Sequence, residues 1–301
     1  MAVSLATALS STMISCSDDD DPVSPSDQTI EAIVNTNANF SLLKAAVTKA
    51  GIGSALAGGT LTVFAPDNDA FAASGITNDV INSLSSAELI NILTYHVVTS
   101  RISSGAVPAS DTVKTLQTRN LYASKNANGV FVNGSKVKTA DIGASNGVIH
   151  VISNVLMPPT KTIAQLASET PDLSRLLTAV TRAGLAGAVS GPGNFTVFAP
   201  TNAAFTAAGF ATDADINAAP EAAVNDIVSA HVLGTNVFAS DLVAGGTANT
   251  IKAGTSLTIG TTPPSVKITG SANPASNIIV PAGVNIIATN GVVHLIDKVL
   301  Q

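Results

Sequence analysis

Apolar positions in the first third of the chain follow a helical pattern in some stretches and an extended pattern in others. Residues 40–50 and 86–93 carry apolar side chains every three or four positions, which predicts a helix with one buried face in each stretch. Gly51 follows the first stretch, at the place where a glycine commonly ends a helix. Residues 61–65 form a short β-branched and aromatic run that Pro66 ends, and they predict a strand.

The pattern changes over residues 112–156, where short extended runs alternate with turn signals. The Asn-Gly pairs at 128–129 and 133–134 are typical of tight β-hairpins. Residues 148–152 form an almost continuous apolar run, which indicates a strand covered on both faces. Helices followed by a β-rich half predict the α+β fold class.

The whole pattern then occurs a second time. Three stretches match later stretches in the same order: 43–51 with 176–184, 62–66 with 196–200, and 146–150 with 290–294. This preserved order predicts a tandem duplication of one domain rather than a solenoid of short repeats. Residues 157–161 join the copies and hold two consecutive prolines, so they predict a short, stiff linker that keeps the two units close.

The amino-terminal segment has the features of an export signal. Residues 2–14 are uncharged and mostly small or apolar, and they are too few for a bilayer span of roughly 20 residues. The run ends just before Cys16, the single cysteine, and resembles the lipobox of bacterial lipoproteins, in which the cysteine is lipidated. It departs from that pattern at Met13, where leucine is usual, and in having no preceding Lys or Arg. The alternative is that Cys16 is an incidental residue of a cleaved peptide.

The residues after Cys16 predict a tether. Ser17 is followed by Asp18–Asp21, which resembles the acidic tag of surface-exposed lipoproteins in the Bacteroidetes group. We therefore expect a secreted protein that is lipid-anchored to the outer membrane, at the cell surface of a Gram-negative bacterium. The predicted segments are a signal peptide at 1–16, an acidic flexible tether at 17–27, domain 1 at 28–157, a linker at 158–161 and domain 2 at 162–301.

The composition excludes several classes of function. The 301 residues hold 14 Lys+Arg against 20 Asp+Glu, a formal net charge of −6, so we expect no nucleic-acid partner. Aromatic residues make up 4% and Trp is absent, which argues against platforms of stacked aromatic rings. A single cysteine excludes an internal disulfide, so apolar burial must hold the fold together.

The repeated motifs resemble those of the fasciclin I (FAS1) domain family. Three family motifs occur: the first at 62–71 and 196–205, a Tyr-His pair at Tyr95 and His96, and the last at 146–156 and 290–300. The second copy departs from the family pattern at Ala230, where the family has tyrosine. The resemblance covers about residues 28–301 and implies two tandem domains, each a β-sandwich or wedge flanked by helices.

The same resemblance implies a role in cell adhesion or matrix contact outside the cell. In some animal members, residues around the Tyr-His motif contribute to integrin binding, and only Tyr95 and His96 can inherit that role here. The alternative for Tyr95 is plain packing in the core. Because Ala230 lacks the amphipathic ring, we expect domain 1 to carry more of any binding centred on this motif.

All four histidines fall at equivalent positions of the two copies, His96 with His231 and His150 with His294. Their neighbours are apolar, and a neutral buried imidazole can bridge two backbone segments by donating from one nitrogen and accepting at the other. We favour this structural interpretation over a metal pair, since zinc needs three or four converging ligands. Catalysis is the third alternative. We expect no metal and no other cofactor.

Residues 67–69 hold two acids around an asparagine, which invites a calcium interpretation. Phe71 and Ala72 stand where an EF-hand loop needs an oxygen ligand and a glycine, and the second copy lacks both acids. We therefore favour a helix cap or turn, with Asn68 and Asn202 closing the turn after the proline.

These observations predict a non-enzymatic, lipid-anchored cell-surface adhesion module that binds an extracellular polysaccharide or a surface or matrix protein. The alternative is a subunit for ligand capture or envelope assembly that works with a transporter or another lipoprotein. The chain has no nucleophile elbow, phosphate loop or dinucleotide fingerprint, so an enzyme is the third choice. The candidate site residues are Cys16 for lipid attachment and Tyr95 and His96 for binding.

Overall fold

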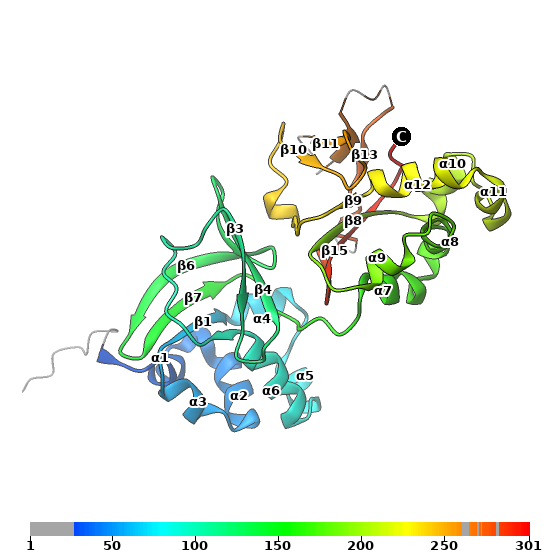
Figure 1. The fold of residues 1–301 in the computed structure, drawn as a ribbon. Coiled ribbons are helices and arrows are strands. Elements are labelled where there is room, and N and C mark those ends of the chain that lie inside the picture. The colour runs from blue at the N-terminus through cyan, green and yellow to red at the C-terminus, as the bar shows by residue number, and fades with distance from the viewer. Residues whose placement is uncertain (1–26, 261–264, 270, 272, 281–282) are drawn as a thin grey trace, which may run out of the picture.

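The computed structural model describes residues 27–260, 265–269, 271, 273–280 and 283–301. Two similar units follow one another there, each with its helices first and most of its strands after them (Figure 1). The predicted signal peptide, Cys16 and the tether up to residue 26 lie outside the described residues. No helix in the described ranges is both long enough and apolar enough to cross a membrane.

Domain 1 begins with short helices, and capping residues in the nearby sequence mark where they begin and end. The two helices predicted from apolar spacing are α2 (Ser41–Ala50) and α6 (Ser86–Tyr95). Helix α2 ends at Gly51 with a left-handed φ of 70°, and α6 begins with a capping box of Ser85 and Glu88. The other helices are α1 (Ile30–Thr36), η2 (Ala38–Phe40), α3 (Gly53–Ala57), α4 (Asn68–Ala73) and α5 (Asn78–Ser83).

The strands of domain 1 form one sheet in the order β2-β1-β7-β6-β5-β4-β3. Their bounds are β1 (Leu61–Pro66), β2 (Val97–Val98), β3 (Ser110–Lys114), β4 (Asn120–Asn126), β5 (Gly129–Val132), β6 (Ser135–Ala144) and β7 (Gly147–Ile152). Strands β1 and β7 run parallel, and every other neighbouring pair is antiparallel. Both hairpins predicted from Asn-Gly pairs are present, as β4 with β5 and β5 with β6.

The parallel pair β1 and β7 separates two hydrophobic layers. Val63 and Ile149 belong to a cluster shared with the helices, whereas Phe64 and Ile152 belong to a second cluster shared with β4, β5 and β6. All residues of β7 are buried, as expected for a strand covered on both faces. The domain is therefore a wedge, with helices on one side of the central strands and the outer strands on the other (Figure 1).

One glycine of the last motif is required by the close approach of the central strands. Gly147 stands opposite Leu61 in the parallel pair, and a Cβ atom there would lie 2.0 Å from the Leu61 carbonyl oxygen. Gly291 has the same relation to Phe195 in domain 2, again at 2.0 Å. Any side chain at either position would push the two central strands apart.

Domain 2 repeats this arrangement. Its helices are α7 (Ile163–Glu169), η3 (Pro171–Leu173), α8 (Ser174–Arg182), α9 (Ala186–Ser190), α10 (Asn202–Ala207), α11 (Asp213–Ala218), α12 (Glu221–Ala230) and η4 (Ala239–Asp241). Its strands are β8 (Phe195–Pro200), β9 (Val232–Leu233), β10 (Thr247–Asn249), β11 (Ser256–Ile259), β12 (Ser265–Ile268), β13 (Ser276–Asn277), β14 (Ile286–Ala288) and β15 (Gly291–Ile296).

The strands of domain 2 form two sheets, β14-β15-β8-β9 and β10-β11-β12-β13. Strands β8 and β15 are parallel, like β1 and β7. Their two faces again meet one cluster shared with helices and another shared with outer strands. The predicted α+β class and the tandem organisation are confirmed.

Candidate functional site

The histidine of the Tyr-His motif bridges two backbone segments. Nδ1 of His96 donates to the carbonyl oxygen of Ile92 over 2.7 Å, and Nε2 accepts the N–H of Leu156 over 2.9 Å. His231 makes the same two bonds at the equivalent position of domain 2. Both rings are therefore neutral bridges, as predicted, and burial lowers the pKa of each to about 4.

The other two histidines work in the same way with the nitrogens exchanged. Nε2 of His150 donates to the carbonyl oxygen of Ile102 over 2.8 Å, and Nδ1 accepts the N–H of Asp141 over 3.2 Å. His294 repeats both bonds in domain 2, and burial lowers its pKa to about 4. Backbone groups thus occupy both ring nitrogens. Within the described ranges, no three residues of His, Cys, Asp or Glu gather as a metal-binding group.

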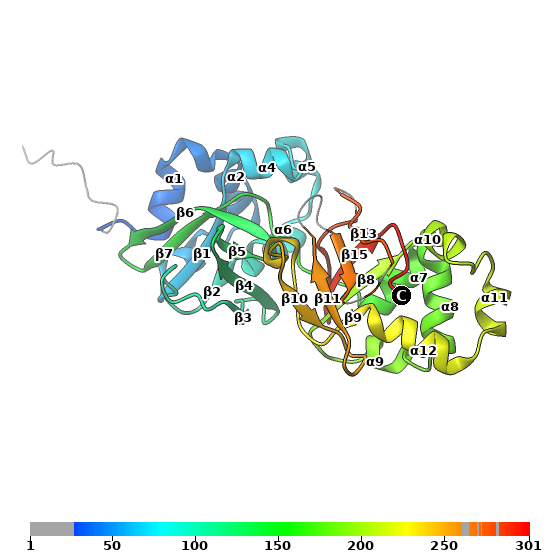
Figure 2. The same cartoon turned by 90° about the horizontal axis from the view of Figure 1, so that it is seen from above.

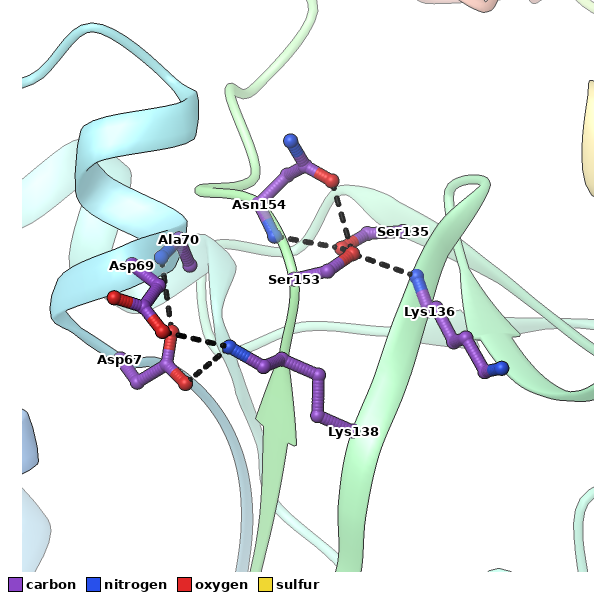
Figure 3. A network of polar contacts seen from close by, with 8 residues as sticks. All are labelled: Asp67, Asp69, Ala70, Ser135, Lys136, Lys138, Ser153 and Asn154. Carbon is purple, nitrogen blue, oxygen red and sulfur yellow. Dashed lines mark hydrogen bonds and ion pairs between the residues drawn. The ribbon is translucent and has the colours of Figure 1, made fainter.

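Of the two acids considered as a calcium site, Asp67 caps a helix and both lie beside Lys138 (Figure 3). The carboxylate of Asp67 accepts the N–H of Ala70 over 2.9 Å and so caps α4. Nζ of Lys138, on β6, lies 2.5 Å from Asp67 and 3.6 Å from Asp69. The hydrogen bond to Asp67 raises the pKa of Lys138. Thr201 caps α10 at the equivalent position, so the acids are not needed for this role.

The recurring asparagine beside this cap has a different role from the predicted one. Oδ1 of Asn68 accepts the N–H of Leu42 over 3.1 Å, and Nδ2 donates to the carbonyl oxygen of Ala38 over 3.0 Å. Asn68 therefore caps the start of α2, which has no side-chain cap of its own. The prediction that it closes the turn after Pro66 was wrong. Asn202 makes the equivalent bonds at α8.

Tyr95 is completely buried, with 0% of its surface exposed. Its hydroxyl donates to the carbonyl oxygen of Asn120 over 3.0 Å and accepts from Nδ2 of Asn133 over 2.9 Å. Burial raises the pKa of Tyr95 to about 12. His96 is 2% exposed, so neither predicted binding residue presents a surface that a partner can touch. Tyr95 is therefore packed in the core, which was the alternative to a binding role.

The two domains meet where outer strands of domain 1 contact a loop of domain 2 (Figure 2). The rings of Tyr122, on β4, and Phe238 stack with centroids 5.1 Å apart and planes at 28°. Phe238 is 2% exposed, belongs to neither hydrophobic cluster of domain 2, and packs against Tyr122 of domain 1. Burial also raises the pKa of the Tyr122 hydroxyl.

Polar contacts support this stack. Oγ of Ser124 donates to the carboxylate of Asp241 over 2.5 Å. Nδ2 of Asn126 donates to the carbonyl oxygen of Ser240 over 2.7 Å. The two domains are thus in direct contact, as a short linker between them led us to expect.

A polar cleft of about 310 Å³ opens beside the stacked rings, and we call it the interdomain cleft. Its volume is at the lower end of the range for small-ligand sites, roughly 300–1,000 Å³. Domain 1 contributes Thr112, Lys114, Thr118, Arg119, Asn120, Tyr122 and Asn133. The linker and domain 2 contribute Pro159, Gly193, Asn194, Asn236, Phe238, Ile287, Ala288, Thr289 and Gly291.

One wall of the cleft is positively charged. It holds Lys114 and Arg119, and none of the lining residues identified in the described ranges is acidic. The guanidinium of Arg119 donates to the carbonyl oxygen of Pro159 over 2.5 Å, which fixes its position. Neither cation belongs to an ion pair among the described residues. Since the whole chain carries a net charge of −6, this wall is a local feature.

Two features of the cleft cost the fold free energy. Thr118 has a φ of 68°, a left-handed conformation that β-branched residues rarely adopt, at a cost of about 1–3 kcal/mol. The N–H and Oγ1 of Thr115 both donate to the carbonyl oxygen of Arg119 over 2.9 Å and hold this turn. Across the cleft, Oδ1 of Asn236 is shielded and has no hydrogen-bond partner among the described residues, which costs roughly 1–3 kcal/mol.

The Tyr95 hydroxyl connects the buried motif to this cleft. Its two partners, Asn120 and Asn133, both line the cleft. Oδ1 of Asn133 in turn accepts the N–H of Tyr122 over 2.8 Å, so the stacked ring is held by the same network. Ala230, at the equivalent position of domain 2, has no hydroxyl to make such bonds. Tyr95 is therefore a positioning residue for the cleft.

A second hollow of about 290 Å³ lies at the same domain boundary and shares Tyr122 and Asn236 with the interdomain cleft. Its one acid, among the lining residues identified, is Asp241, which already accepts from Ser124. The interdomain cleft is the better candidate site because its two cations form no ion pair within the described part of the chain.

Sequence reasoning missed the cleft because its aromatic and charged residues do not recur between the copies. Tyr122 corresponds to Thr258 in domain 2, because Tyr122 pairs with Thr112 and Thr258 pairs with the equivalent Thr247. Phe238 corresponds to Ser103 in domain 1, since each follows the carbonyl that a bridging histidine contacts. The available signal was an aromatic residue present in one copy only, in a chain with 4% aromatics.

Comparison with known proteins agrees with the repeated architecture. The family profile described as "Fasciclin domain" matches residues 38–158 and again residues 171–301. These two matches fall on domain 1 and domain 2 and together span most of the chain.

Several curated proteins are similar to the chain. The pig transforming growth factor-beta-induced protein ig-h3 is 32% identical over 247 residues, which are 80% of this chain and 35% of that protein. Human periostin is 28% identical over 247 residues, 80% of this chain and 28% of its own length. Protein sll1483 of Synechocystis sp. is 42% identical over 134 residues, 44% of this chain and 74% of that protein. The chain thus spans about a third of the ig-h3 protein's length.

Among solved structures, a domain pair from the insect cell adhesion molecule fasciclin I aligns with the chain at 18% sequence identity. The alignment covers 89% of this chain and 94% of that one, with a TM-score of 0.42.

Proposed function

Because the chain belongs to the fasciclin domain family, whose members are adhesion-related, we propose that it is a non-enzymatic adhesion module for an extracellular polysaccharide or protein. The observation that carries the proposal is the interdomain cleft, which both domains build together. Recurring residues such as Asn68 and His150 are engaged in holding the fold, whereas the cations and aromatic rings of the cleft are particular to one copy. Residues that the fold does not require are the ones available for recognition.

In this proposal Tyr95 and His96 support the binding site without touching the partner. Tyr95 holds Asn120 and Asn133 at the wall of the cleft. His96 accepts from Leu156, two residues before the linker at 158–161, and so fixes the end of domain 1. The Tyr-His motif of domain 1 therefore still supports binding more than its counterpart in domain 2 does. The residues that touch the partner are those of the cleft.

We further propose that a lipid on Cys16 attaches the chain to the outer membrane, with the acidic residues that follow as a tether. The support is the sequence: Cys16 ends an uncharged run and precedes Asp18–Asp21. Many anchored copies would bind a surface at once, so weak binding at each cleft would be enough to retain a cell. The change Cys16→Ser should release the chain from the membrane fraction, and unchanged fractionation would count against the anchor.

Cell retention tests the proposed function. Bacteria without adhesins of their own display the full chain and are washed over surfaces coated with polysaccharides or with matrix proteins. We expect more cells to remain than in a strain that displays nothing, on at least one class of surface, and purified chain in solution should compete. Retention no greater than that of the control strain on every surface would overturn the proposal.

The alternative of ligand capture beside a transporter calls for an enclosed apolar site. Three apolar cavities inside the described parts of the domains measure about 40, 20 and 10 Å³. Sites for small molecules begin at roughly 300 Å³, so these cavities are far too small. The sizes favour adhesion through the open polar cleft.

A further inference from the structure

We propose that the interdomain cleft binds a segment of an anionic polysaccharide, with a carboxylate or sulfate group of the sugar held between Lys114 and Arg119. This inference rests on the proposed function and names the ligand class of its site. Lys114 ends β3 and pairs with Asn120, the residue that follows Arg119, so both cations come from one hairpin. The hairpin delivers two positive charges to one wall of the cleft.

The state of these cations favours an anionic ligand. Neither is neutralised by an acid among the described residues, although acids outnumber bases in the chain, 20 to 14. The bond from Arg119 to Pro159 uses part of the guanidinium and orients the rest, and a guanidinium has five N–H donors. An oriented guanidinium binds carboxylate or sulfate oxygens with two parallel hydrogen bonds. The two hydrogen bonds from Thr115 to the carbonyl oxygen of Arg119 hold the turn that carries this side chain.

The remaining lining favours a saccharide over a small anion. Hydroxyl and amide side chains line both walls: Thr112, Thr118, Asn120, Asn194, Asn236 and Thr289. Such groups both donate and accept hydrogen bonds, which matches the hydroxyl groups of a sugar. A free phosphate or sulfate ion would fill only a small part of about 310 Å³. An acidic peptide is the competing ligand, because β3 is the edge strand of its sheet and could pair with another backbone.

The test measures binding of the purified full chain to oligosaccharides of polygalacturonate by calorimetry. The same oligosaccharides with methyl-esterified carboxylates are the matched control, because esterification removes the charge and leaves the sugar chain. Dextran sulfate against dextran makes the same comparison for sulfate. We expect at least one charged saccharide to bind. Its neutral counterpart should have an affinity that is lower by about tenfold or more. Equal binding of charged and neutral members, or no binding of either charged saccharide, would overturn the inference.

Variants locate the binding in the cleft. Lys114→Gln and Arg119→Gln should each weaken binding about tenfold. Lys136→Gln is the matched control, because Lys136 is an exposed lysine of the same domain that does not line the cleft. It changes the net charge equally and should leave binding unchanged. Equal losses in all three variants, or none in the two cleft variants, would contradict the proposal, provided that each variant keeps the parent's Tm.

Two further outcomes separate this inference from the proposed function. In the first, poly-glutamate binds, the saccharides do not, and the binding depends on Lys114 and Arg119. This result would identify an acidic peptide as the ligand and overturn the inference. Cells that display the chain could remain on another surface although the purified chain binds no charged saccharide. That result would refute the ligand class but not the proposed function. Loss of retention on all surfaces would refute the proposed function as well.

Discussion

Nδ2 of Asn133 donates to the hydroxyl of Tyr95 over 2.9 Å, and this bond joins the Tyr-His motif to the interdomain cleft. The tyrosine lies in the core and the asparagine lies in the cleft wall. The motif therefore shapes the surface of domain 1 without being part of that surface.

Removing this hydroxyl should weaken both the fold and the cleft. Tyr95→Phe leaves the carbonyl oxygen of Asn120 and the amide of Asn133 without their partner, so we expect the free energy of unfolding to fall by about 1–3 kcal/mol. Denaturant titration measures the change. Tyr122→Phe, at the other of the two tyrosines, is the matched control and should cost less because Tyr122 is only partly buried. Equal costs would contradict the expectation that burial makes the Tyr95 hydrogen bonds the more important ones.

Acid should destabilise the protein through its buried histidines. Burial lowers the pKa of His96, His231 and His294 to about 4, below the ordinary value of 6.5, so the unfolded chain binds protons first. Their stabilisation is complete above pH 6.5 and is lost as the pH falls towards 4, by roughly 3 kcal/mol for each histidine. Domain 2 holds two of the three and should respond more steeply. Hydrogen exchange at several pH values resolves the two domains.

A matched variant separates this effect from acid denaturation in general. His231→Gln should lower stability at pH 7 and flatten the pH dependence of domain 2, because the titrating group is gone. A free energy of unfolding that does not change between pH 6.5 and 4.5, or a slope that His231→Gln leaves intact, would contradict the assignment.

Gly147 should tolerate no side chain. A Cβ atom at this position would lie 2.0 Å from the carbonyl oxygen of Leu61, so Gly147→Ala should separate β1 from β7 at a cost of about 3 kcal/mol or more. Gly58→Ala is the control, because a Cβ atom there meets no atom of the described residues within 4 Å and the φ of Gly58 is −112°. Thermal unfolding compares the two variants. Similar Tm values for both would show that the close approach does not limit this position.

Phe238 should hold the two domains together. Phe238→Ser restores the small residue that domain 1 has at Ser103, and it removes the stack on Tyr122. Because Phe238 lies outside both hydrophobic clusters of domain 2, each domain should keep its fold while the radius of gyration in solution increases. Small-angle scattering measures this, with Phe238→Tyr as the control that keeps an aromatic ring. An unchanged radius in Phe238→Ser would mean that other contacts are sufficient.

The parts of the fold that could be predicted depend on neighbours in the sequence. Apolar spacing and Gly51 predicted α2, and the Asn-Gly pairs predicted the hairpins of β4, β5 and β6. The bridging role of His96 also followed from local context, because apolar neighbours on both sides imply a buried neutral ring.

The candidate site depends on contacts that no local pattern records. Ser124 and Asp241 meet across 117 positions, and Tyr122 and Phe238 stack across a domain boundary. The residues that the two copies share, such as His96 and His231, are those that hold the fold. Asn68 shows the same limit, because its bonds reach α2 rather than the adjacent turn.

Filling the interdomain cleft tests the central claim, that binding takes place there. Asn194 is exposed and lines the cleft, so Asn194→Trp should block it without changing any charge. Asn82→Trp, at an exposed position of α5 that does not line the cleft, is the matched control. The measurement is retention of cells that display each full chain on the surface that retains the parent. We predict that Asn194→Trp abolishes retention and Asn82→Trp preserves it; full retention with a blocked cleft would contradict the account.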